Sequence, residues 1–317
     1  MINIAIVESP FQFWMAREYQ EHSESRLDFK FIVRGLIPEH KILFQENLLN
    51  SSPFKYYPSQ NSFLTLFNVL KITLLYRNKV KTLVIPFYYS IFYKLCINAI
   101  NPTEVVYVDD GTHTIEASKN FDDFLYKKID AKFFSIFKEC AINKKFFIAN
   151  NLPLSKSFLS KPSTHENNEL ALNIWVGNSL VPDYLSRSRY IDCMRDSGVE
   201  NAGFGWIYFA SRTETISDIE KIKEAFSKIK IIKPSVNLEI YLIKNNIHFN
   251  KMRGFMSTCF FTLKILYHNQ NIDFEIIYPS EFNDDGVSDR DYKDANKRQR
   301  LFYKYADQSG FKLKDSN

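Results

Sequence analysis

Short apolar segments alternate with helical patterns along the first half of the chain, and this rhythm restricts the fold more than any other feature. Apolar runs with the length of buried strands occur at 3–7, 29–33, 80–86, 104–108 and 146–149. Helical patterns follow at 10–19, 38–49, 62–76, 88–100 and 121–137. Because strands that alternate with helices pair side by side, the pattern predicts a doubly wound parallel sheet.

The same rhythm begins again in the second half. Residues 151–168 are rich in Ser, Pro, Asn and Lys, and we interpret them as a linker. Strand patterns then recur at 170–176, 206–210, 230–233, 251–255 and 274–278, with helical patterns at 184–196, 217–228, 238–244, 257–267 and 289–308. The predicted fold class is α/β, with two Rossmann-like domains facing a cleft, as in the glycosyltransferase-B fold. The expected boundaries are 1–155, 169–288 and a helical tail over 289–317.

Charge and cysteine usage narrow the class of protein. The net charge of +5 comes without a concentrated basic stripe, which argues against nucleic-acid binding. The four cysteines, Cys96, Cys140, Cys193 and Cys259, are well separated, and three of them lie in apolar or helical surroundings. This pattern predicts buried thiols in a reducing compartment and no structural metal site. No signal-peptide pattern or bilayer-spanning apolar segment is present, so we expect a cytoplasmic protein, with peripheral contact to an anionic membrane left open.

An Asp-Asp-Gly triplet at 109–111 directly follows the apolar strand 104–108. Ligands of open α/β sheets bind at the carboxyl ends of strands, so Asp109 and Asp110 are candidates for a general base. Gly111 allows a sharp backbone turn beneath them. A strand-to-loop turn that caps a helix is an equally good interpretation. A second such triplet at 284–286 lies in a polar loop and is predicted to be a turn.

A second candidate site follows the strand at 251–255. After Gly254, Ser257 and Thr258 open a helix, and free backbone N–H groups with two hydroxyls would suit a phosphate. The alternative is an ordinary helix cap. Two further carboxylates are weaker candidates. Glu239, near the start of a short helix, could accept hydrogen bonds from ribose hydroxyls, and Glu214, in the loop after the strand 206–210, is a candidate for catalysis.

Histidine and glycine patterns exclude other chemistries. His113, two residues after the triplet, is the histidine best placed to face the site, and no two histidines have metal-ligand spacing. The chain lacks a Walker loop, a G-x-S-x-G motif and a complete G-x-G-x-x-G fingerprint, which makes a Rossmann oxidoreductase the least favoured class.

Taken in order, four short motifs resemble those of bacterial sialyltransferases of the lipooligosaccharide and capsule type, including polysialyltransferases. They are a Ser-Pro-x-Gln turn (Ser9, Pro10, Gln12), the Asp109–Asp110 pair, a Pro-x-x-x-x-Glu stretch (Pro234, Glu239) and the Ser257–Thr258 pair. The resemblance covers most of the chain and rests on their order.

The resemblance implies an inverting, metal-independent glycosyltransferase with no cofactor. It would move sialic acid, or a related nonulosonic acid, from a CMP-sugar to a glycan acceptor of a surface polysaccharide. The first domain would lie on the acceptor side, and Ser257 and Thr258 would hold the CMP phosphate. The family's His-Pro motif has no counterpart here. This absence is consistent with a non-catalytic nucleotide- or glycan-binding relative. A UDP- or GDP-sugar transferase of the same architecture also stays open, as does a homodimer.

Overall fold

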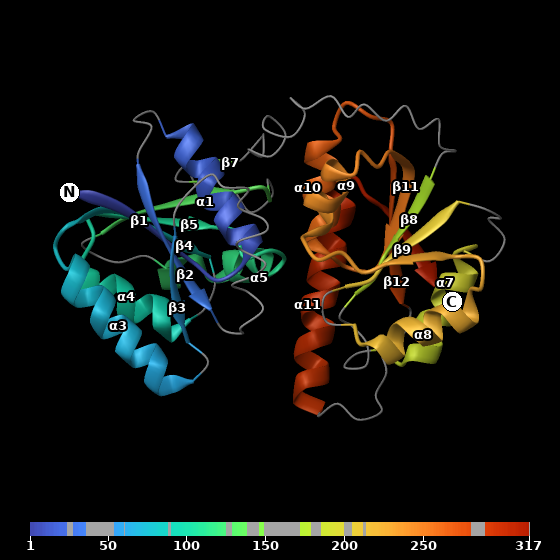
Figure 1. The fold of residues 1–317 in the computed structure, drawn as a ribbon, viewed down its shortest axis with the longest axis horizontal. Helices are drawn as coiled ribbons and strands as arrows, with labels where there is room; N and C mark the ends of the chain where they lie inside the picture. Colours follow the sequence, from blue (N-terminus) through green and yellow to red (C-terminus); the bar gives the residue numbers. More distant parts are fainter. Residues whose placement is uncertain are drawn as a thin grey trace. The chain divides into compact units, whose positions relative to one another are not determined.

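The chain divides into two compact units, 1–160 and 161–317, which are described separately (Figure 1). The computed structural model describes residues 1–23, 28–35, 54–59, 61–87, 90–124, 129–137, 146–148, 172–178, 185–199, 205–211, 214–279 and 289–316. The helix expected over 38–49, the linker over 151–168 and the turn at 284–286 lie outside these residues.

A parallel sheet in the order β3-β2-β1-β4-β5-β6-β7 forms the first unit. Its strands are β1 Ile2–Val7, β2 Phe29–Gly35, β3 Phe54–Pro58, β4 Val80–Pro86, β5 Glu104–Val108, β6 Asp130–Ser135 and β7 Phe146–Ile148. The strand order reverses between β1 and β4, which pair in parallel. Open α/β sheets bind their ligands at such a reversal point, outside the carboxyl ends of the strands.

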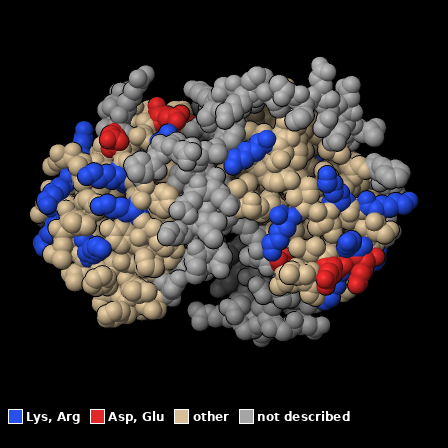
Figure 2. All heavy atoms as spheres, in the orientation of Figure 1, with Lys and Arg blue, Asp and Glu red and all other residues tan. Residues whose placement is uncertain are grey.

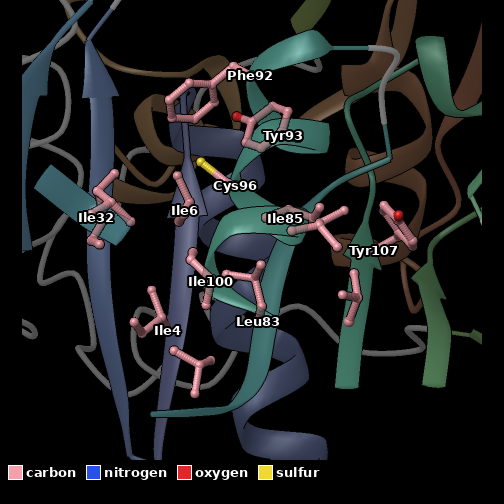
Figure 3. Close-up of a cluster of buried hydrophobic side chains, with 14 of the residues drawn as sticks. Ile4, Ile6, Ile32, Leu83, Ile85, Phe92, Tyr93, Cys96, Ile100 and Tyr107 are labelled. Carbon is pink, nitrogen blue, oxygen red and sulfur yellow. The ribbon is translucent and has the colours of Figure 1, made fainter. Parts of the chain in front are cut away.

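Helices pack on this sheet and bury an apolar core. They are α1 Pro10–His22, α3 Ser62–Tyr76, α4 Ile91–Ile100 and α5 His113–Ala117, with a 3-10 helix at Ser118–Phe124. Side chains of β1, β2 and β4, such as Ile6, Ile32 and Ile85, meet Phe92 and Cys96 of α4 in one cluster (Figure 3). This packing fixes the strand ends where the first candidate site lies.

The second unit has a parallel sheet in the order β10-β9-β8-β11-β12-β13. Its strands are β8 Leu172–Val176, β9 Trp206–Phe209, β10 Lys230–Ile232, β11 Phe249–Gly254, β12 Asp273–Pro279 and β13 Lys312–Ser316. Its helices are α7 Arg187–Asp196, α8 Ile216–Ala225, α9 Leu238–Lys244, α10 Thr258–Leu266 and α11 Asp289–Gln308. Here the order reverses between β8 and β11, which also pair in parallel.

The prediction of a long helix over 121–137 is wrong. The segment begins with the end of the 3-10 helix, and Asp130–Ser135 forms β6, which pairs with β5 and β7. Ala131, Phe133 and Phe134 are all buried, because β6 lies inside the sheet. The strands β3 and β13 were not predicted at all.

Within the described residues, no helix is both long and apolar enough to cross a bilayer. Cys96, Cys193 and Cys259 are buried free thiols, as predicted, and Cys140 lies outside the described residues.

Candidate functional site

The first candidate site is built on the start of α1, directly after β1. Ser9 caps the helix, and its side chain accepts a hydrogen bond from the Gln12 N–H at 3.2 Å. The Gln12 Oε1 accepts the N–H groups of Glu8 at 2.6 Å and Ser9 at 3.3 Å. The Gln12 amide nitrogen donates to Asp110 Oδ1. Pro10 occupies the first helical position, and Gln12 lies two residues further along α1. Gln12 therefore connects the end of β1 to the end of β5.

Asp109 lies in the interior at the end of β5, with 1% of its surface exposed. Its Oδ2 accepts the backbone N–H of Ile136 at 2.7 Å, which joins the ends of β5 and β6. Burial raises the pKa of Asp109 to about 7, and hydrogen bonds from Ser135, Ile136 and Thr114 reduce this rise. The group can therefore be neutral near physiological pH.

Asp110 is only partly buried and is the more accessible carboxylate of the pair. Its backbone N–H donates to Thr114 Oγ1 at 2.9 Å, and Gly111 follows with a φ of 61°, which a glycine adopts without strain. Burial raises the pKa of Asp110, while the Gln12 hydrogen bond and the charge of nearby His113 lower it. His113 itself is exposed at the start of α5. A carboxylate of raised pKa at a strand end can accept a proton from a bound hydroxyl.

An ion pair that we did not predict adjoins this site. Glu8 follows β1, Arg34 lies near the end of β2, and their side chains form a partly buried ion pair. The Arg34 guanidinium also lies 4.2 Å from the ring centre of Phe92. Burial raises the pKa of Glu8, and Arg34 lowers it. The only sequence signal was that both residues end apolar strands.

The second candidate site lies where β8 and β11 end. A β-carbon on Gly254 would lie 2.8 Å from the Val176 carbonyl oxygen, so the two strand ends approach each other too closely for a side chain. The Asn178 amide nitrogen donates to the Met256 carbonyl, which ties the loop after β8 to the loop after β11. These contacts fix the backbone just before α10.

Ser257 caps α10, and its side chain accepts the Cys259 N–H at 3.4 Å. Ser257 and Thr258 are both partly exposed, and Thr258 is the first helical residue. The N-terminus of a helix attracts anions through its free N–H groups and its dipole. The predicted Ser-Thr pair therefore lies where a phosphate could be bound.

Glu239 and Pro234 differ in their surroundings. Glu239 is buried in the first turn of α9, and its Oε1 accepts the Thr262 hydroxyl of α10 at 2.6 Å. Glu239 therefore joins α9 to α10. Pro234 is partly exposed in the loop between β10 and α9.

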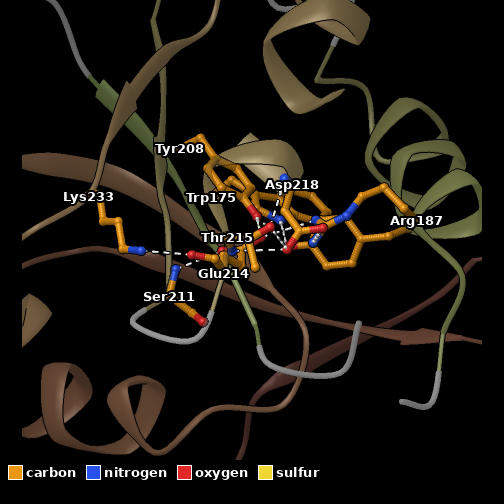
Figure 4. A network of polar contacts seen from close by, with 9 residues as sticks. Trp175, Arg187, Tyr208, Ser211, Glu214, Thr215, Asp218 and Lys233 are labelled. Atoms are coloured by element: carbon orange, nitrogen blue, oxygen red, sulfur yellow. Dashed lines mark hydrogen bonds and ion pairs between the residues drawn. The ribbon is translucent and has the colours of Figure 1, made fainter. Parts of the chain in front are cut away.

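Glu214 lies at the centre of a buried polar network (Figure 4). Its Oε1 accepts the Tyr208 hydroxyl at 2.6 Å and an Arg187 N–H at 3.1 Å, and its Oε2 accepts the Ser211 N–H at 2.7 Å. Lys233 donates to its carbonyl oxygen at 2.7 Å. With these partners, Glu214 shapes the loop at the end of β9.

No group of three or more His, Cys, Asp or Glu side chains in the described part of the chain is arranged to hold a metal ion.

The fold has counterparts among solved structures, although no protein-family model and no curated protein sequence matches the chain. S. aureus MnaA in a co-structure with UDP is similar with a TM-score of 0.58, at 10% identity, over 96% of this chain and 91% of that chain. The UDP-GlcNAc 2-epimerase from Neisseria meningitidis, bound to UDP-GlcNAc, gives 0.56 at 11% identity over 96% and 91%. A glycosyltransferase from Rickettsia africae gives 0.50 at 11% identity over 88% and 79%.

Two parallel Rossmann-like sheets and these likenesses define the class of protein. The chain has the glycosyltransferase-B fold, and the predicted fold class is confirmed.

Proposed function

We propose that the protein is a glycosyltransferase that uses a nucleotide-sugar donor. The observation that carries this proposal is the Asp109–Asp110 pair at the carboxyl end of β5, next to the reversal point of the first sheet and joined by Gln12 to the end of β1. A proton acceptor at that position is what the transfer of a sugar to a hydroxyl group requires. The first unit would bind the glycan acceptor near Ser9, Pro10, Gln12 and His113.

Asp110 is the proposed general base, because it is partly exposed and its Oδ1 is held by Gln12. Asp109 is a positioning residue, since its carboxyl group is buried and binds the backbone at the end of β6. Asp110 would take the proton of the acceptor hydroxyl while that oxygen attacks the anomeric carbon. The bond from that carbon to the nucleotide phosphate would break with inversion. Glu214 is left without a catalytic role, since its carboxylate is already fully engaged.

The proposed donor site is the carboxyl edge of the second sheet. The N-terminus of α10, with Ser257 and Thr258, would stabilise the departing phosphate without a metal ion. Glu239, in the first turn of α9, and Pro234, in the loop before that helix, would contact the nucleoside. A UDP-sugar is the donor we favour, because two of the similar structures hold UDP or UDP-GlcNAc.

A CMP-activated sialic or nonulosonic acid is the second candidate donor. It is favoured by the order of the four motifs that resemble bacterial sialyltransferases. Calorimetric titration with UDP, CMP, GDP and NAD distinguishes the donors. Selective binding of UDP supports our first choice, and selective binding of CMP supports the second. Binding of NAD alone, or of none of the four, would contradict a nucleotide-sugar transferase.

Turnover is tested with the Asp110→Asn variant, which keeps the shape of the side chain and an oxygen for Gln12. We expect nucleotide affinity to be unchanged and transfer to fall by about 100-fold or more, the usual contribution of a general base. The matched control is Asp122→Asn, at an exposed aspartate of the 3-10 helix. Activity that survives EDTA would support metal-independent transfer, and activity restored only by a divalent cation would contradict it.

A further inference from the structure

The outer face of α3 is apolar. Phe63 is 76% exposed and Leu74 is 74% exposed, values that large apolar side chains reach at few other places among the described residues. The exposed apolar residues of this helix are Phe63, Leu66, Phe67, Leu70, Leu74 and Leu75. They repeat with helical spacing, so Phe63, Phe67, Leu70 and Leu74 form one stripe about 16 Å long.

The inner face of α3 is committed to the core of the first unit. Val69, Ile72 and Tyr76 are buried there, and Asn68 donates to the Pro58 carbonyl at 2.5 Å. A surface helix of a globular protein normally has a polar outer face. The exposed stripe is therefore not needed for the packing of α3, and it calls for an apolar environment outside the unit.

Neighbouring α4 extends this surface. The two helices lie side by side (Figure 1), and α4 exposes Ile91, at 79%, and Leu95. We call the exposed apolar residues of both helices the α3–α4 face. Several large apolar side chains exposed on two neighbouring helices usually mark an interaction surface.

The charged residues near the α3–α4 face indicate what kind of partner would bind there. Between Glu46 and Glu104 the sequence contains no acidic residue, and it carries Lys55, Lys71, Arg77, Lys79, Lys81 and Lys94. Lys71 and Lys94 are exposed on the two helices themselves. Figure 2 shows basic side chains and uncharged surface, without acidic side chains, where α3 and α4 lie. Anionic groups complement a surface of this composition.

We infer that the α3–α4 face binds the surface of an anionic lipid bilayer. Its Phe and Leu side chains would enter the boundary between headgroups and acyl chains, and its basic residues would meet the lipid phosphates. A second copy of this chain would bring two basic surfaces together without acidic partners, which disfavours it as the occupant. The inference rests on this face alone and does not depend on the proposed function.

The test is co-sedimentation of the full chain with lipid vesicles. One set contains phosphatidylcholine and phosphatidylglycerol in equal amounts, and the other contains phosphatidylcholine only. We expect clear binding to the mixed vesicles and weak binding to the neutral ones. The Phe67→Ser, Leu70→Ser, Leu74→Ser variant should lose binding by about tenfold or more, because three exposed apolar side chains no longer enter the lipid.

Two matched controls separate this surface from general effects. Ile216→Ser removes an apolar side chain that is 75% exposed on α8 of the other unit, and it should bind as the unchanged protein does. Lys71→Glu with Lys94→Glu should abolish binding to mixed vesicles, whereas the same charge change at Lys221 and Lys223 of α8 should weaken it only slightly. Circular dichroism confirms that each variant is folded.

Three outcomes would overturn the inference. The first is equal binding by the unchanged protein and the triple serine variant, and the second is equal binding to both vesicle types. The third is a dimer in light scattering that the triple variant disrupts while no vesicles are bound, which would make a second copy the occupant.

Discussion

Replacing Asp109 with asparagine should stabilise the first unit at neutral and alkaline pH. Asp109 is buried, and its pKa rises from 3.8 to about 7 because burial disfavours the carboxylate. The folded chain therefore binds this proton more tightly than the unfolded chain does. The contribution of Asp109 to the free energy of unfolding is therefore greatest below about pH 4. It falls as the pH rises to about 7 and is constant above that.

The size of the effect follows from the shift in pKa. A difference of about three pKa units corresponds to about 4 kcal/mol of unfolding free energy above pH 7. Asparagine stays neutral, and its side-chain oxygen can still accept the Ile136 N–H. The variant should thus be more stable than the unchanged protein by up to about 4 kcal/mol at pH 8, and equal to it near pH 4.

The measurement is unfolding by urea, followed through amide hydrogen exchange of peptides from β1 and β5, so that the second unit does not contribute. Asp122→Asn, at an exposed position, serves as the control and should change little at any pH. An Asp109→Asn variant that is no more stable than the unchanged protein at pH 8 would refute the reasoning. So would a gain in stability that is the same at pH 4 and pH 8.

Three further substitutions have definite expected outcomes. Gly177→Ala places a β-carbon 2.3 Å from Glu214 Oε2, and it should destabilise the second unit by about 1–3 kcal/mol, as measured by hydrogen exchange of β8. Arg187→Met leaves the Glu214 carboxylate buried without its cation, and it should lower the free energy of unfolding by about 3–5 kcal/mol, as measured by thermal unfolding. The double variant that also carries Glu214→Gln should recover part of that loss. Gln12→Ala removes a hydrogen bond that lowers the pKa of Asp110, so the acidic limb of the profile of kcat/KM against pH should move to higher pH.

The central strands could be predicted from the sequence because both faces of a parallel sheet are covered, which requires continuous apolar runs. Edge strands do not have this requirement. Among the described strands, β3 pairs only with β2. The strand β13, with the sequence Lys-Leu-Lys-Asp-Ser, pairs there only with β12. Lys312 and Leu313 are both exposed, so nothing in the pattern of β13 indicates a strand. Its position depends on the open edge of β12.

β6 could not be recognised for a different reason. Its Phe133 and Phe134 are adjacent in sequence and both buried, which fits a helix as well as a strand that is covered on both sides. Only the pairing with β5 on one side and β7 on the other decides between them.

The candidate site was predicted in part. Asp109 and Asp110 follow a clear apolar strand, so their place at the edge of the sheet could be inferred. The contact of Asp110 with Gln12 and the ion pair of Glu8 with Arg34 join residues 98 and 26 positions apart. Such contacts depend on the order of the strands in the sheet, which the sequence pattern does not specify.

The place of β13 has a consequence for the synthesis of the chain. Every described strand of the first sheet is complete once residue 148 has been made, so this sheet can form while the second is still being translated. The second sheet receives its outer strand only with residues 312–316, after α11. Until then β12 has an unpaired edge, which can pair wrongly with other chains. Truncation before residue 312 should therefore cause aggregation, even though every residue of both candidate sites is still present.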